Sequence, residues 1–197
     1  NFSIEMYQAI IWTTRLVAVC VLIDTFEKFL NFKEFKNNGI FSWEWLRQFF
    51  GFTQRRQVIR HIADSVFGFR IWFFLLMLRG LSAVYLLFWT EQNYLISIAL
   101  FVLLVVGSLE NFRRMPFRPE TPNRFTLLII GALFLQSLVP SEIVTQACLW
   151  FIALQSCLSY ATSGIAKLFN KDWLSGNGVL YAANSPYYFT SPKIAYF

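Results

Sequence analysis

One lysine near the end of the last long apolar run stands where a general base could work. Lys167 closes that run and is followed closely by Asp172 and Trp173. At 100° per residue, the polar side chains of this run share one helix sector of about 140°: Gln155, Ser156, Ser159, Tyr160, Ser163 and Lys167. Small hydroxyls at this spacing allow close helix packing, so a packing face is one interpretation. The other is a polar path that leads a ligand or a proton to Lys167, where an ammonium stripped of water can serve as a base near neutral pH.

Two arginines interrupt other apolar runs. Arg15 and Arg79 both fall near the middle of their runs, and charged side chains inside a bilayer are costly and mark functional sites. We expect the two arginines to lie at comparable depth and to lack a carboxylate partner within the membrane, because Asp24, Glu27 and Glu110 fall at the ends of the runs. Three interpretations stay open: snorkelling to the interface, pairing with backbone carbonyls, or binding an anionic or carbonyl-bearing ligand.

Other chemical motifs are missing from the sequence. His61 is the single histidine, and Cys20, Cys148 and Cys157 all fall within apolar runs without a CxxC pair. Such a distribution supports neither a disulfide framework nor a zinc or haem site. There is no GxSxG, P-loop or GxGxxG pattern. The sequence therefore predicts no metal site and leaves open whether the chain is an enzyme.

The composition predicts an integral membrane protein. Of 197 residues, 56% are hydrophobic and 14% are charged, whereas soluble domains carry about 25% charge. The aromatic share of 19% fits rings placed at the depth of lipid headgroups.

We expect one domain over residues 1–197, an all-α polytopic transmembrane bundle with about five spans. A span needs about 20 predominantly apolar residues, and the runs that approach this length cover residues 4–23, 66–89, 94–109, 125–139 and 143–169. The segment 40–63 alternates large apolar rings with charges, which predicts an interfacial amphipathic helix or a re-entrant element. A lid over a cavity is its alternative interpretation.

The basic residues predict the orientation. Segment 24–65 holds seven Lys and Arg, segment 110–124 holds four, and the turns 90–93 and 140–142 hold none. By the positive-inside rule, the long loops and the C-terminal tail are cytoplasmic, in a bacterial inner membrane or an organelle equivalent. We expect this face to contact anionic lipid headgroups. Nucleic acid is not an expected partner, since the basic residues border apolar spans.

The block around Lys167 resembles the signature of a known membrane domain. Tyr160, then Ser163-Gly164-Ile165-Ala166-Lys167-Leu168, then Asp172-Trp173-Leu174-Ser175-Gly176 is similar to the Y…(S/A)G-x-x-K-L…W-x-x-G pattern of the HTTM domain. Vitamin K-dependent gamma-glutamyl carboxylases share this domain with bacterial membrane proteins related to the sporulation-delay B protein. Arg15, Arg79-Gly80 and the number of predicted spans agree with the same family.

The resemblance implies a helical bundle in which the lysine and the W-x-x-G turn border a cavity for an amphipathic or quinone-like molecule. Lys167 would be the base. The candidate ligand-binding residues are Arg15, Arg79, Ser159, Ser163, Tyr160 and Trp173. Two departures argue against glutamate carboxylation. Ala166 stands where the carboxylases have the first of two lysines, and the charge rule places Lys167 near the cytoplasm rather than the lumen.

Two functions follow from these expectations. The first is a non-carboxylating accessory or maturation factor in a membrane assembly or a peptide-processing or export system, with other membrane subunits as partners. The alternative is a membrane enzyme with a lipid-soluble, quinone-like cofactor, in which Lys167 is the base and Arg79 or Arg15 stabilises negative charge. A transporter is a third interpretation, which no internal repeat or pair of broken helices supports.

Overall fold

The computed structural model describes residues 2–36, 39, 42–50, 57–89, 93–113 and 121–184, and the regular elements among them are all helices. The expected all-α class is therefore confirmed. Among the described residues, four helices are long and apolar enough to cross a membrane, over Ile4–Leu30, Phe69–Phe88, Tyr94–Arg113 and Glu142–Leu168. The predicted span 125–139 corresponds to a shorter apolar helix, Arg124–Leu138, so the count of five spans stays a prediction.

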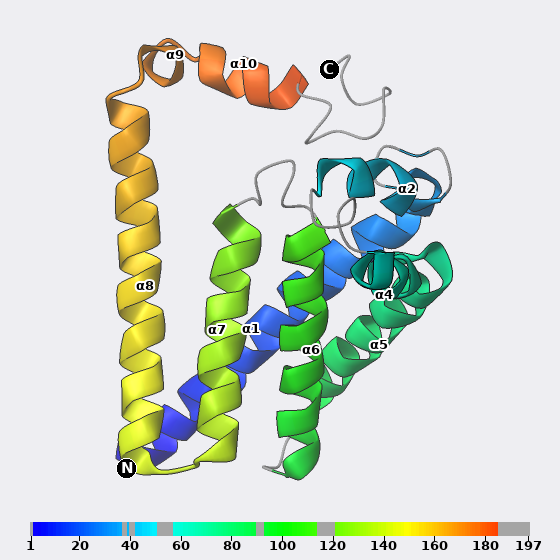
Figure 1. Ribbon diagram of the computed structural model, residues 1–197. Coiled ribbons are helices and arrows are strands. Elements are labelled where there is room, and N and C mark those ends of the chain that lie inside the picture. Colours follow the sequence, from blue (N-terminus) through cyan, green and yellow to red (C-terminus); the bar gives the residue numbers. More distant parts are fainter. Residues whose placement is uncertain are drawn as a thin grey trace. The chain divides into compact units, whose positions relative to one another are not determined.

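The contacts divide the chain into two compact units, residues 1–150 and 151–197. In the first unit, α1 (Phe2–Leu30) contacts α5 (Phe69–Phe88) and α7 (Thr121–Leu138). The remaining helix of this set, α6 (Tyr94–Arg113), also contacts α5 and α7. In Figure 1, α1 passes obliquely behind α6 and α7. These four helices thus enclose a common centre, where Val21, Leu103 and Ile130 are almost fully buried.

Two of these helices extend beyond the predicted spans. The helix α1 continues past residue 23 to Leu30, and α6 continues past residue 109 to Arg113. Neither extension contains Gly or Pro, the residues that most strongly disfavour a helix. The charged residues Asp24, Lys28 and Glu110 therefore lie on helices of the bundle and not in loops.

A group of short helices precedes α5. It consists of η1 (Phe32–Phe35), α2 (Trp43–Leu46), η2 (Arg47–Phe49) and α4 (Gln57–Phe67). Together with the first turns of α5, these elements bury a hydrophobic cluster whose members are Phe35, Trp43, Leu46, Phe50, Ala63, Phe67, Trp72 and Leu76. The helix α4 ends where Gly68 begins an extended turn, and a Cβ on Gly68 would lie 2.8 Å from the carbonyl oxygen of Asp64. This turn makes α5 begin at Phe69 and not at the predicted residue 66.

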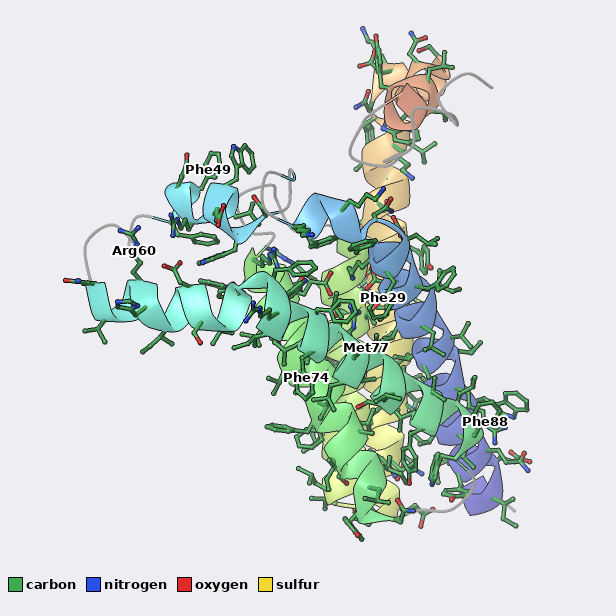
Figure 2. The ribbon with its side chains drawn as sticks, turned by 90° about the vertical axis from the view of Figure 1, so that its right-hand side faces the viewer. Phe29, Phe49, Arg60, Phe74, Met77 and Phe88 are labelled. Atoms are coloured by element: carbon green, nitrogen blue, oxygen red, sulfur yellow. The ribbon has the colours of Figure 1, made fainter. Side chains whose placement is uncertain are left out.

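The predicted interfacial segment 40–63 is therefore several short elements and not one continuous helix, with residues 40–41 and 51–56 outside the described part. Asp64 joins these elements, because its carboxylate accepts a hydrogen bond from Trp43 Nε1 at 2.7 Å and pairs with Arg47 and Arg60. In Figure 2, α4 runs across the direction of α5, with Arg60 on the side of α2. Val58 and Ile62 on α4 are 72% and 61% exposed, as expected of an amphipathic helix whose apolar face is exposed.

The second unit begins within α8 (Glu142–Leu168), which is followed by α9 (Lys171–Leu174) and α10 (Asn177–Asn184). The last two helices contact each other. The side chain of Asn170 caps α9 by accepting a hydrogen bond from the backbone N–H of Asp172 at 2.9 Å.

Candidate functional site

Four charged side chains meet inside the first unit, and we call them the buried ion network: Asp24 and Lys28 on α1, Arg79 on α5 and Glu110 on α6. Arg79 Nη1 lies 2.5 Å from Glu110 Oε2 and 2.8 Å from Asp24 Oδ2. Lys28 Nζ contacts the same two carboxylates. Only 3% of the Lys28 side chain, 5% of Glu110 and 8% of Arg79 is exposed, against 27% of Asp24.

The positions of these residues on their helices explain the network. Asp24 and Lys28 are four residues apart on α1, so they lie on one face of the helix. The helix α5, which carries Arg79, approaches α1 closely, since a Cβ on Gly80 would lie 3.7 Å from the Thr25 methyl group. Two carboxylates and two cations balance each other, and a buried charge is tolerated only when it is paired in this way.

The expectation that Arg79 lacks a carboxylate partner is wrong. It rested on ending the helices before Asp24 and Glu110, which would have left both acids in loops. Because α1 and α6 continue, they carry these carboxylates to the guanidinium of Arg79. A helix can continue beyond its apolar run where the charges of the added residues are paired. The apolar runs alone therefore underestimated the lengths of α1 and α6.

Arg15 lies midway along α1, beside the C-terminal end of α5. Its Nη2 donates a hydrogen bond to the backbone carbonyl of Trp89 at 3.1 Å, and its guanidinium carbon lies 5.6 Å from the centre of the Trp12 ring. This is the backbone-carbonyl interpretation among the three considered. Along α1, Arg15 is about 13 Å from Asp24, the partner of Arg79, at 1.5 Å per residue. The two arginines therefore do not share one depth, and that prediction is wrong.

A cavity of about 250 Å³ adjoins the buried ion network. Asp24, Arg79, Glu110 and Asn111 form its polar part. Val21, Leu103 and Ile130 form an apolar part. Gly107 of α6 and Leu127 also line the cavity. They pack closely against each other, since a Cβ on Gly107 would lie 2.6 Å from Leu127 Cδ2. The cavity is thus amphipathic, with charged and amide groups in one part and aliphatic side chains in another.

Lys167 lies in the second unit and contacts an aromatic ring. Its Nζ is 4.6 Å from the centre of the Trp173 ring, a cation–π distance. Gly178 packs on the same indole, because a Cβ there would lie 2.8 Å from Trp173 Cδ2. Gly176 has φ +82°, a left-handed conformation that favours glycine. We call residues 167–178 the exit motif, in which a lysine, a tryptophan and two glycines are held together by local geometry.

We call the polar sector of α8 (Gln155, Ser156, Ser159, Tyr160, Ser163 and Lys167) the polar stripe. Hydroxyls in this stripe and beside it bond to carbonyls of their own helix. Ser156 Oγ donates to the Ile152 carbonyl at 2.7 Å, and Thr162 Oγ1 donates to the Leu158 carbonyl at 2.8 Å. Back-bonded hydroxyls of this kind need no partner from another helix. Ser159, Tyr160 and Ser163 lie on α8 before Lys167. The structure therefore brings Lys167 to Trp173, and separately brings Arg79 to Asp24 and Glu110.

The sequence reasoning did not select Asp24, Lys28, Glu110 or Asn111 as site residues. One signal was available, since an Asp and a Lys four residues apart directly after an apolar run are typical of a helix that continues. The contact of Glu110 with Arg79, 31 residues away in the chain, had no signal in a single sequence.

Comparison with family models, with curated proteins and with solved structures finds no match for this chain.

Proposed function

We propose that this chain is an integral membrane protein of the HTTM type that works as a non-carboxylating accessory or maturation factor. It would act in a membrane assembly or in a peptide-processing or export system, beside other membrane subunits. The observation that carries this proposal is the pairing of Arg79 with two carboxylates, Asp24 and Glu110. A cation neutralised in this way holds α1, α5 and α6 together and has little charge left to stabilise a reacting anion.

The position of Lys167 supports the same proposal. Its Nζ lies 4.6 Å from the centre of the Trp173 ring, which is a cation–π distance, whereas a general base must lie within hydrogen-bond reach of the proton that it removes. The lining of the cavity comes from α1, α5, α6 and α7. These features favour a role in binding over a role in proton transfer.

Exposed aromatic and aliphatic side chains support the membrane setting. On α5, Phe74, Leu81 and Phe88 are 64%, 67% and 75% exposed, while the charged residues of the buried ion network are inside. Such an arrangement suits a hydrocarbon solvent. We propose a bacterial inner membrane or an organelle equivalent, with cytoplasmic basic loops and C-terminus, and with Val58 and Ile62 of α4 at the headgroup level.

The proposal is tested by placing a photo-crosslinking amino acid at Ser159 or Ser163 in the full chain, expressed in its own membrane. If the polar stripe of α8 packs against a partner subunit, both positions give one discrete adduct of constant size. Leu154, on the opposite side of α8 at 100° per residue, is the matched control and gives none. Equal adducts from all three positions would contradict a specific assembly.

The enzyme alternative predicts a different outcome. If Lys167 were the base of a quinone-dependent enzyme, the purified chain would bind a lipid-soluble quinone, and Lys167→Met would abolish this binding in a protein that still folds and inserts. Under the accessory proposal, Lys167→Met leaves the Ser159 and Ser163 adducts in place. If Lys167→Met loses quinone binding and keeps the Ser159 and Ser163 adducts, this result would favour the enzyme function.

A further inference from the structure

The cavity beside the buried ion network has no unbalanced charge among its described surroundings. Asp24, Arg79 and Glu110 contribute to the lining. Lys28, which is not part of the lining, pairs with the two carboxylates and makes the sum of the four charges zero. Arg113, one turn beyond Glu110, packs over the Trp72 ring at 4.6 Å and is not part of the lining. A charged ligand would have to leave water without gaining a counter-ion, which is strongly unfavourable. The cavity therefore favours an uncharged ligand.

One polar group at the cavity is available for a hydrogen bond. The side-chain oxygen of Asn111 is buried and has no hydrogen-bond partner in the part of the chain that the structure describes, and Asn111 belongs to the lining. A buried polar atom without a partner carries a desolvation penalty. A hydroxyl donates a hydrogen bond, so it can satisfy the side-chain oxygen of Asn111, which an ether oxygen cannot do because it only accepts.

The size and the apolar part of the cavity define the rest of the ligand. A volume of about 250 Å³ exceeds the roughly 150 Å³ that hold benzene in an engineered core. It falls just below the range of about 300–1,000 Å³ of sites for drug-sized molecules. Val21, Leu103 and Ile130 are 1–2% exposed and face this space. The space thus suits a small polar head and the first carbons of an alkyl chain.

We propose that this cavity binds an uncharged amphiphile whose polar end is a hydroxyl, as in an alkyl alcohol or the glycerol head of a neutral lipid. The hydroxyl bonds to the Asn111 amide beside the buried ion network, and the alkyl part lies against Val21, Leu103 and Ile130. This site goes beyond the accessory role and stands independently of it, since it needs neither a partner subunit nor Lys167.

Cys20 provides the probe, because it is exposed and also lines the cavity. In a Cys148→Ala/Cys157→Ala background, Cys20 is the single thiol. Its alkylation by N-ethylmaleimide is followed in nanodiscs made of phosphatidylcholine, because this lipid has no hydroxyl. Four probes that each carry an unbranched ten-carbon chain are compared: decan-1-ol, methyl decyl ether, decylammonium and decanoate. We expect decan-1-ol to slow alkylation about fivefold more than the ether does, the factor expected of one added hydrogen bond.

Three variants separate the cavity from general membrane effects. Asn111→Leu removes the hydrogen bond, so the alcohol and the ether become equal. Thr126→Phe fills the cavity from α7, where Thr126 belongs to the lining, and abolishes protection by every probe. Leu128→Phe on the same helix lies outside the lining and is 44% exposed, so protection by decan-1-ol persists.

The origin of the ligand is distinguished by adding dioleoylglycerol to the nanodiscs. Protection by this lipid identifies a neutral membrane lipid as the source, whereas protection by decan-1-ol alone identifies a free alcohol. Equal protection by all four probes, or stronger protection by decylammonium or decanoate, overturns the proposal. Neither result bears on the crosslinks from Ser159 and Ser163, so failure of this site and failure of the accessory role remain distinct.

Discussion

The partners of an individual charge decide its role in this molecule. Arg79 and Lys167 are both cations within or beside apolar helices, but Arg79 is held by two carboxylates and Lys167 by an indole ring. Arg15 shows a third solution, a hydrogen bond to the carbonyl at the end of α5. Each of these cations contacts a different kind of partner, so the residue type alone could not distinguish structural from functional charges.

At the residue scale, we predict that removing one charge from the buried ion network is more harmful than removing a balanced pair. Glu110→Gln leaves Arg79 and Lys28 with a single carboxylate, Asp24, and should lower the free energy of unfolding by about 3–5 kcal/mol. The double variant Lys28→Met/Glu110→Gln keeps the Arg79–Asp24 pair and should lose less than the single variant does. Titration with SDS in mixed micelles measures both values.

Glu142→Gln is the control, because Glu142 is exposed in the first turn of α8. It loses only its interaction with the helix terminus, about 1 kcal/mol or less. A double variant less stable than Glu110→Gln would show that Lys28 stabilises the fold by something other than charge balance.

At the scale of elements, the ends of the helices place the functional groups. Continuing α1 to Leu30 and α6 to Arg113 forms the buried ion network. Because α8 ends at Leu168 and Asn170 caps α9, Trp173 of α9 reaches Lys167. The turn at Gly176 then brings Gly178 onto the Trp173 ring. The W-x-x-G spacing thus has a local physical cause, which is the positive φ of Gly176.

The exit motif depends on the absence of a side chain at Gly178. In Gly178→Ala, the new Cβ meets the rigid indole of Trp173 at 2.8 Å, and overpacking of this kind costs about 1–3 kcal/mol. We therefore predict that backbone amides in 169–184 exchange with deuterium about tenfold faster or more in this variant. Hydrogen-exchange mass spectrometry in nanodiscs measures the rates.

Gly164→Ala is the matched control, because a Cβ at Gly164 meets nothing within 4 Å. Alanine in a helix interior is favoured over glycine by about 1 kcal/mol, so exchange in 169–184 should not accelerate. Similar acceleration in both variants would mean that the contact of Gly178 with Trp173 does not hold the exit motif together.

At the scale of the whole molecule, the number of membrane crossings depends on α7. Its apolar part, Arg124–Leu138, is shorter than the other candidate spans, while the full helix Thr121–Leu138 has 18 residues. At 1.5 Å per residue this is about 27 Å, close to the roughly 30 Å hydrocarbon core. A helix of this length can cross a slightly thinned bilayer, so we expect α7 to cross.

Cysteine labelling on both sides of α7 checks this expectation. In a chain whose three native cysteines are alanine, Arg118→Cys should react with a membrane-impermeant maleimide only after the cells are permeabilised. Ser141→Cys, between α7 and α8, should react in intact cells. Labelling of both positions from one side would show that α7 does not cross, and labelling of Arg118→Cys alone in intact cells would reverse the orientation predicted from the basic loops.

The sequence by itself determined the helical class and the approximate location of the long apolar helices. The predicted span 94–109 lies within α6, and 143–169 nearly coincides with α8, because runs of apolar residues depend only on local composition. Lys167 and Trp173 were also selected from the sequence, as a base and a ligand-binding residue, while their contact with each other came from the structure. Only the tertiary structure decided that Arg79 meets Asp24 and Glu110, and that a cavity lies beside them. The physical reason is that these residues come from three helices, and only the packing of those helices shows which buried charges neutralise one another.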